Sequence, residues 1–195
     1  MTDEIKSEQE SQKKQIMITG TNNRYQMKKV TQKKALPKKR VLVESWNLEP
    51  EFYTYEKQIE LLEQIKQNDY APLSNFPLLN KEIERKIQGY RQQDVDKKVL
   101  DSEKIVKLLN VIQMLIESQL NCYYCKTQIF VLYEMSRENS QWTLDRIDND
   151  LGHNIDNILI CCLKCNLKRR RTNKDKFLMT KQLNIVRDGL RDGLL

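Results

Sequence analysis

The sequence lacks any long apolar run, and its 195 residues include a single histidine. Its most apolar segment, from Ile105 to Ile116, is interrupted by lysine, asparagine and glutamine, so no stretch approaches the roughly 20 apolar residues of a membrane span. The opening residues MTDEIKSEQE contain no apolar core of the kind that a secretory signal requires. We therefore expect a soluble, intracellular protein without membrane contacts.

The sequence contains no internal repeat. It also lacks the even number of cysteines that a disulfide framework would need. Five cysteines in a chain without an export signal favour thiolate metal ligands over disulfides. Charged residues make up 31% of the chain and the hydrophobic set 39%, which predicts a modest core and a well-solvated surface. The net charge of +7 favours polyanionic partners, of which nucleic acid is the commonest.

Residues 1–45 are expected to form a disordered basic arm. Residues 1–15 are nearly all polar or charged. The stretch from Arg24 to Arg40 carries eight basic residues and no acidic one. It fits either a flexible arm that binds phosphates by counterion release or a solvated tail or localisation signal, and the sequence leaves both open.

The stretch 46–120 is expected to be a helical accessory region, because its apolar residues recur at helical spacing. Asp101 or Ser102 can cap its last helix. No motif in this stretch carries a recognisable chemistry, so a packing role is favoured. The expected helices span about 54–69, about 80–93 and about 102–120.

Two C-x2-C pairs follow, Cys122 with Cys125 and Cys162 with Cys165. Four thiolates match tetrahedral zinc, and two such pairs in a basic intracellular chain fit zinc better than a redox pair. The fifth cysteine, Cys161, is expected to be a buried apolar residue. Only Cys162 preserves the knuckle spacing, and neighbours on a strand point to opposite faces.

The 36 residues between the two pairs exceed the roughly 12–20 of a minimal zinc finger, so the zinc closes a loop that holds further elements. This loop contains Trp142–Asp148 and Leu151–Asn157, and Ile160–Asn166 completes the pattern. In order, spacing and residue type, the stretch 122–171 resembles the HNH endonuclease family (His-Me finger or ββα-metal nucleases) in its zinc-knuckle form. The variant with Asp-Arg-Ile-Asp followed by Gly-His looks like a branch seen in phage and large DNA-virus proteins.

The resemblance implies an α+β fold, with a small zinc-bound ββα-metal module over 121–187 that follows the helical region. The residues agree with this reading. Gln141–Ile147 and Asn157–Cys162 have the composition of strands, and turn chemistry lies between them. From Leu163 onward the composition is helical.

The resemblance also assigns roles to residues. Asp145 corresponds to the first catalytic metal ligand and Asn166 to the second, around Mg²⁺ or Mn²⁺. Asn157 corresponds to the central asparagine, which braces the loop between the strands. The simpler alternatives are a surface carboxylate for Asp145 and an ordinary turn residue for Asn157.

Arg146 departs from the family, which places its general base, a histidine, at that position; arginine stays protonated and cannot act as one. Arg146 could instead hold a phosphate oxygen or stabilise the leaving group. The only histidine, His153, is the candidate base, with a phosphate contact or loop packing as its alternatives. Asp148 is a weaker candidate for the same role.

A run of four cations opens the following helix and predicts contact with a nucleic-acid backbone. The leading hypothesis is therefore a metal-dependent endonuclease that hydrolyses DNA phosphodiester bonds and needs no small-molecule cofactor. The alternatives are a non-catalytic, zinc-stabilised nucleic-acid-binding module and a structural zinc ribbon that mediates protein contacts. The four cations are Lys168, Arg169, Arg170 and Arg171.

Overall fold

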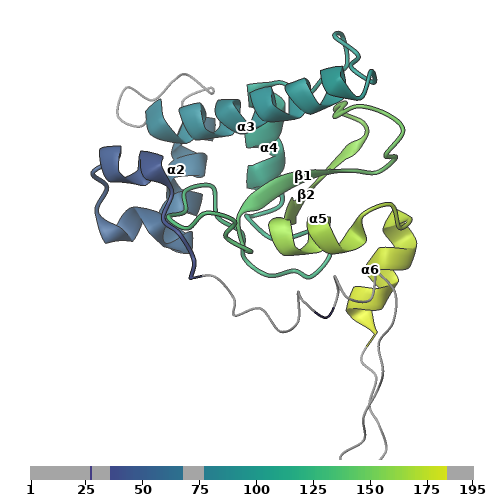
Figure 1. Cartoon of the computed structure of the whole chain (residues 1–195). Coiled ribbons are helices and arrows are strands. Elements are labelled where there is room, and N and C mark those ends of the chain that lie inside the picture. Colours follow the sequence, from purple (N-terminus) through teal and green to yellow (C-terminus); the bar gives the residue numbers. More distant parts are fainter. Residues whose placement is uncertain (1–26, 28–35, 68–76, 184–195) are drawn as a thin grey trace, which may run out of the picture. The chain divides into compact units, whose positions relative to one another are not determined.

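The computed structural model describes residues 27, 36–67 and 77–183 (Figure 1). The chain divides into two compact units, Met1–Leu36 and Pro37–Leu195. Apart from Met27 and Leu36, the first unit lies outside the described residues, and so does the predicted disorder of its basic arm. The helices and strands with determined bounds all belong to the second unit.

The second unit is α+β, as the sequence predicts. Its described part holds five α-helices, two short 3-10 helices and one sheet of two antiparallel strands. No helix in this part is both long and apolar enough to cross a membrane. The elements are η1 (Val41–Ser45), η2 (Pro50–Tyr53), α2 (Tyr55–Gln67), α3 (Pro77–Asp96), α4 (Leu108–Glu117), β1 (Trp142–Arg146), β2 (Ile158–Cys162), α5 (Leu163–Arg169) and α6 (Lys174–Gln182).

One hydrophobic core joins the helical region to the hairpin. Leu62 of α2, Ile83 of α3 and Ile112 of α4 belong to the same buried cluster as Leu144 of β1 and Ile160 of β2. The expected boundary near residue 120 therefore separates no independent cores. The helices form the layer of the structure against which the hairpin packs.

Residues 37–45, expected to belong to the basic arm, lie instead in the packed unit. Arg40 is the reason: its guanidinium pairs with the buried carboxylate of Glu82 and lies over the rings of Trp46 and Tyr133. Its backbone N–H also donates to the carbonyl of Glu134. A cation held by a buried partner and two aromatic faces is no longer part of a free arm.

The third helix is shorter than predicted, since α4 begins only at Leu108. Asp101 does cap a turn, because its Oδ1 accepts from the backbone N–H groups of Glu103 and Lys104. The chain then leaves the helical path. Ile105 forms a β-bridge with Asn154, and the N–H of Val106 donates to the carbonyl of His153. The backbone that sequence assigned to a helix is used to hold the loop that carries His153.

The hairpin matches the prediction to within one residue at each end. Trp142 pairs with Cys162 and Arg146 with Ile158. The edge of β1 that faces away from β2 is covered by side chains. The N–H of Leu144 donates to the Tyr90 hydroxyl of α3, and its carbonyl accepts from the side-chain amide of Asn166. Edge groups satisfied in this way fix α3 and α5 against the sheet.

Lys86 of α3 completes this edge. Its Nζ donates to Oε1 of Gln141 at 2.9 Å and to the carbonyl of Trp142. The rings of Tyr133 and Trp142 lie 5.0 and 4.8 Å from the ammonium. Burial, together with the charges of the neighbouring arginines, lowers the pKa of Lys86 to about 7.

This lowered pKa predicts a pH-dependent stability. Between about pH 7 and 10.5 the unfolded chain holds a proton on Lys86 that the folded protein has released, so the free energy of unfolding rises with pH in this window. The slope is at most about 1.4 kcal/mol per pH unit. We expect Lys86→Met to remove most of the rise between pH 7.5 and 9 in urea titrations of the metal-loaded protein. The exposed Lys81→Met on the same helix should keep it.

Candidate functional site

Four cysteines form a cluster at the corner between the hairpin and α5. The sulfur atoms of Cys122, Cys125, Cys162 and Cys165 lie within 4.8 Å of one another. Cys125 Sγ and Cys162 Sγ are 3.8 Å apart, close to the roughly 3.8 Å that tetrahedral Zn–S bonds of about 2.3 Å require. Among the described histidine, cysteine and acidic residues, these four are the group able to hold a metal ion such as zinc.

The chemistry of these thiols also fits a metal. A hydrogen bond from Cys162 lowers the pKa of Cys122 to about 4, so one thiolate forms easily. That hydrogen bond and burial raise the pKa of Cys162, and burial with the Cys122 charge raises the pKa of Cys165 to about 12. Four thiolates this close together need the charge of a cation.

Cys161 stays outside the cluster, as predicted. It is fully buried, and its sulfur lies 3.3 Å from the Thr143 hydroxyl on the other strand. Burial raises the pKa of Cys161 well above its ordinary value, so it remains a neutral thiol. The strand pleat is the reason, because it turns Cys161 and Cys162 to opposite faces.

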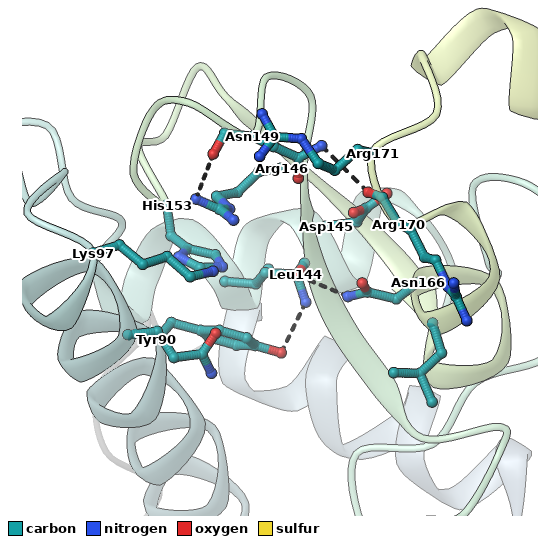
Figure 2. A pocket seen from close by; sticks show the side chains of 12 residues that line it. Tyr90, Lys97, Leu144, Asp145, Arg146, Asn149, His153, Asn166, Arg170 and Arg171 are labelled. Carbon is teal, nitrogen blue, oxygen red and sulfur yellow. Dashed lines mark hydrogen bonds between the residues drawn. The ribbon is translucent and has the colours of Figure 1, made fainter. Parts of the chain in front are cut away.

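A cleft of about 710 Å³ lies along the edge of β1 that faces away from β2, between α3 and α5 (Figure 2). His153 and Lys97 lie on one side of it and Asn166 and Arg170 on the other. Most charged side chains at this cleft are cationic. The lining residues are Tyr90, Gln93, Lys97, Leu144, Asp145, Arg146, Asn149, His153, Asn166, Leu167, Arg170 and Arg171.

His153 is held by Asp94, near the C-terminal end of α3. Its Nδ1 lies 2.7 Å from Oδ1 of Asp94, and its backbone N–H donates to Oδ2 of the same carboxylate at 2.6 Å. The Tyr90 ring lies 4.6 Å from the imidazole. Burial lowers the pKa of His153 below its ordinary 6.5, against the opposing effect of Asp94, so the ring is neutral at neutral pH.

Sequence reasoning missed Asp94 and Tyr90. Asp94 lies 59 residues before His153, in a helix without a motif, and only the fold brings the two together. One sequence signal does exist, namely Gly152. A Cβ on this residue would lie 2.7 Å from the Val99 carbonyl and 3.0 Å from Asp94 Oδ2, so the close approach of loop and helix requires glycine.

Asn157 braces the loop between the strands. Its Oδ1 accepts from the backbone N–H of Asp148, and its Nδ2 donates to the carbonyls of Asp148 and Gly152. All three bonds are 2.8–2.9 Å long. Asp148 itself is a turn residue whose Oδ1 accepts from the N–H of Asp150. Asn157 therefore holds the start of the His153 loop and does not line the cleft.

Asp145, predicted as a ligand of the catalytic metal, and Arg169, predicted as a nucleic-acid contact, form a buried ion pair. Arg169 is 1% exposed and grips both oxygens of Asp145, through Nε at 2.6 Å and Nη2 at 3.1 Å. The Tyr124 hydroxyl donates to Asp145 Oδ2 at 2.7 Å. The prediction that Arg169 contacts nucleic acid from the surface is therefore wrong, because its charge is buried against a carboxylate. Tyr124 is itself buried beside this ion pair.

The side-chain oxygens expected to coordinate the catalytic metal are partly occupied by hydrogen bonds. Three hydrogen bonds leave Asp145 one acceptor position, on Oδ1. Asn166 donates through Nδ2 to Thr143 Oγ1 and to the Leu144 carbonyl, and its Oδ1 makes no hydrogen bond with a described residue. Two such oxygens are of the type that Mg²⁺ accepts, but the charge of Arg169 weakens their hold on a cation.

The other predicted cations keep access to the cleft or its rim. Arg146 donates through Nη1 to the carbonyls of Asn149 and Leu151, so it pins the loop while lining the cleft. Arg170 also lines the cleft, with a backbone φ of 53° after the end of α5. Arg171 lines it as well and pairs with the exposed Asp150, whereas Lys168 is exposed outside it.

No protein-family model, curated protein or solved structure matches the chain.

Proposed function

We propose that this protein is a metal-dependent endonuclease of the HNH type that hydrolyses DNA phosphodiester bonds in the cleft. The observation that carries the proposal is the arrangement around His153. The one imidazole of the chain lies in the same cleft as the cations Lys97, Arg146 and Arg170. A neutral base beside clustered positive charge suits the attack of water on a bound phosphodiester.

The residues of the cleft divide this work. His153 takes the proton of the attacking water, and the cations hold the phosphate and balance the charge that grows on its oxygens. Asp145 and Asn166 would each offer one oxygen to Mg²⁺ or Mn²⁺. When bound, this ion supplies polarisation of the phosphate and stabilisation of the leaving oxygen. Because Arg169 neutralises Asp145, the negative charge of the DNA itself is needed for the ion to bind well.

We further propose that the cysteine cluster holds a structural zinc ion. It connects Cys122 and Cys125, which follow α4, with Cys162 and Cys165 at the start of α5. By fixing the start of α5, the cluster determines the positions of Asn166 and Arg170 relative to β1. Thiolate ligands favour a reducing, intracellular location, and the Asp-Arg-Ile-Asp variant agrees with a viral origin.

The second candidate is a non-catalytic, zinc-stabilised nucleic-acid-binding module. Two observations favour it, namely the arginine at position 146 and the ion pair that neutralises Asp145. It keeps the cationic cleft and the cysteine cluster but performs no cleavage. It predicts that DNA binding is independent of Mg²⁺ and Mn²⁺.

Nicking of supercoiled plasmid by the zinc-loaded full chain, with Mg²⁺ or Mn²⁺, decides between the two candidates. The nuclease relaxes the plasmid with metal and leaves it supercoiled without. Binding without nicking under either metal supports the second candidate.

Arg170→Ala tests whether the cleft is the binding surface. We expect the affinity for DNA to fall by roughly three- to tenfold at low salt, and the slope of log affinity against log salt to fall by about 1. The matched control is Lys81→Ala, which removes an exposed cation on α3 far from the cleft lining. An equal loss in both variants would mean that the cleft is not the nucleic-acid surface.

A further inference from the structure

We infer that Asp94 is a positioning residue that holds His153 with its proton on Nδ1 and leaves Nε2 as the proton acceptor of the cleft. This inference rests on the proposed function, since it concerns the residue that is hydrogen-bonded to the proposed base, His153. Asp94 belongs to α3, in the helical region for which the sequence indicated only a packing role.

The hydrogen bonds determine which ring nitrogen carries the proton. Both oxygens of Asp94 face His153, one toward its backbone N–H and one toward Nδ1. A carboxylate accepts and does not donate, so the Nδ1 side of the contact must be the donor. The remaining proton-free nitrogen is Nε2, and no described residue bonds to it. A histidine that lines a cleft with an unprotonated Nε2 is ready to accept a proton there.

The contact between Asp94 and His153 is buried and is not an incidental surface pair. The side chains of Asp94 and His153 are 1% and 4% exposed. The loop is fastened to the segment after α3, because Val106 donates to the carbonyl of His153 and Ile155 donates to that of Lys104. Gly152 lets the loop approach within contact of Asp94. The imidazole therefore has little freedom to turn its other nitrogen toward the carboxylate.

The charges that face His153 show what else Asp94 does. Arg146 of β1 and Lys97, just past the end of α3, both oppose a positive charge on the imidazole. The third neighbour, Tyr90 of α3, is uncharged, because burial raises its pKa well above its ordinary value. Asp94 is the carboxylate that stabilises His153 once it has taken up a proton, through a hydrogen bond and through its charge. Without it, the cationic cleft would oppose the protonation that catalysis needs.

Nuclear magnetic resonance of the zinc-loaded full chain tests the tautomer directly. Because the chain has one histidine, its long-range ¹H–¹⁵N correlations need no assignment. Above pH 7.5 we expect a protonated Nδ1 and an unprotonated Nε2. A protonated Nε2, or a rapidly exchanging mixture of the two tautomers, overturns the inference. This measurement needs no nuclease activity, so it also stands if the proposed function fails.

Asp94→Asn tests the catalytic consequence. The His153 backbone N–H can only donate, so it retains the amide oxygen, and the NH₂ then faces Nδ1 and drives the proton to Nε2. We expect kcat for nicking to fall by about 10²-fold or more with DNA affinity unchanged, and the acid limb of the residual activity to move to lower pH. A tautomer signal that moves to protonated Nε2 in this variant accompanies the loss.

The matched control is Asp96→Asn, two residues along the same helix, where an exposed carboxylate accepts from Gln92. This variant should keep the wild-type rate and pH profile. If Asp94→Asn folds, as judged by near-ultraviolet circular dichroism, and keeps the wild-type rate and acid limb, Asp94 is a packing residue only and the inference fails. If it does not fold, the tautomer of the wild-type chain decides alone.

Discussion

Cys162→Ser is expected to abolish the cooperative unfolding transition of this protein at 25 °C, whereas Cys161→Ser next to it leaves that transition in place. Cys162 ends β2, caps the first turn of α5 by accepting from the N–H of Cys165, and contributes a sulfur to the cluster. Structural zinc contributes roughly 10–16 kcal/mol in small peptides, which exceeds most of the roughly 5–15 kcal/mol that stabilises a whole domain. In the proposed zinc site, the loss of one of four ligands would therefore remove a large share of the total stability.

The neighbouring cysteine is a matched control. Cys161 is equally buried but belongs to the opposite face of β2, where it contacts Thr143. Cys161→Ser places a hydroxyl in the same space and should destabilise by about 1–3 kcal/mol with one zinc per chain retained. Zinc content, measured together with urea unfolding at 25 °C, separates the two variants. Zinc retained in Cys162→Ser and lost in Cys161→Ser would reverse the assignment of the ligand.

Loss of the imidazole is expected to have the largest effect on activity. His153→Ala should lower kcat for plasmid nicking by about 10²–10⁴-fold, the usual range for general-base assistance, with DNA affinity nearly unchanged. Because burial holds the pKa of His153 below 6.5, the wild-type rate should reach half its maximum below pH 6.5. The rate then falls at lower pH as the imidazole takes up a proton and loses its function as a base.

A second variant separates catalysis from packing. His153→Ala leaves a buried oxygen of Asp94 without its ring partner, which by itself destabilises by about 1–3 kcal/mol. His153→Gln can still donate to that oxygen but cannot act as a base. If nicking returns in His153→Gln, His153 serves packing alone. Recovery of His153→Ala by added imidazole, without recovery by an uncharged amide, would identify the missing group as a base.

The cysteine pattern shows how much local sequence can determine. The spacing of Cys122, Cys125, Cys162 and Cys165 predicted a cluster that the structure contains, and the strand alternation predicted that Cys161 is excluded from it. The hairpin was likewise predicted from local sequence, namely the composition of its two strands and the turn residues between them. Strand alternation, turn residues and knuckle spacing act over a few residues, so they can be read without knowing the fold.

The site itself depends on contacts between residues far apart in the chain. Asp145 reads as an available carboxylate and Arg169 as one of four surface cations, yet they lie 24 residues apart as a buried ion pair. Asp94 carries no motif, and it is 59 residues from the histidine that it holds. The helix expected from residue 102 was shortened because a bridge to the His153 loop used its backbone. Propensity cannot foresee such tertiary competition.

By itself, the sequence predicted the cysteine cluster from the spacing of its two C-x2-C pairs, and the two strands from their composition and the turn residues between them. The α+β class followed from the resemblance to the HNH family, with which these residues agree. Tertiary structure alone decided which charges are available in the cleft. Lys97, Arg146 and Arg170 line the cleft, whereas Arg169 is buried in an ion pair with Asp145. Helix α3 supplies the partner of His153. The physical reason is burial: a charge removed from water must find a partner, and only the packed chain determines which partner lies within reach.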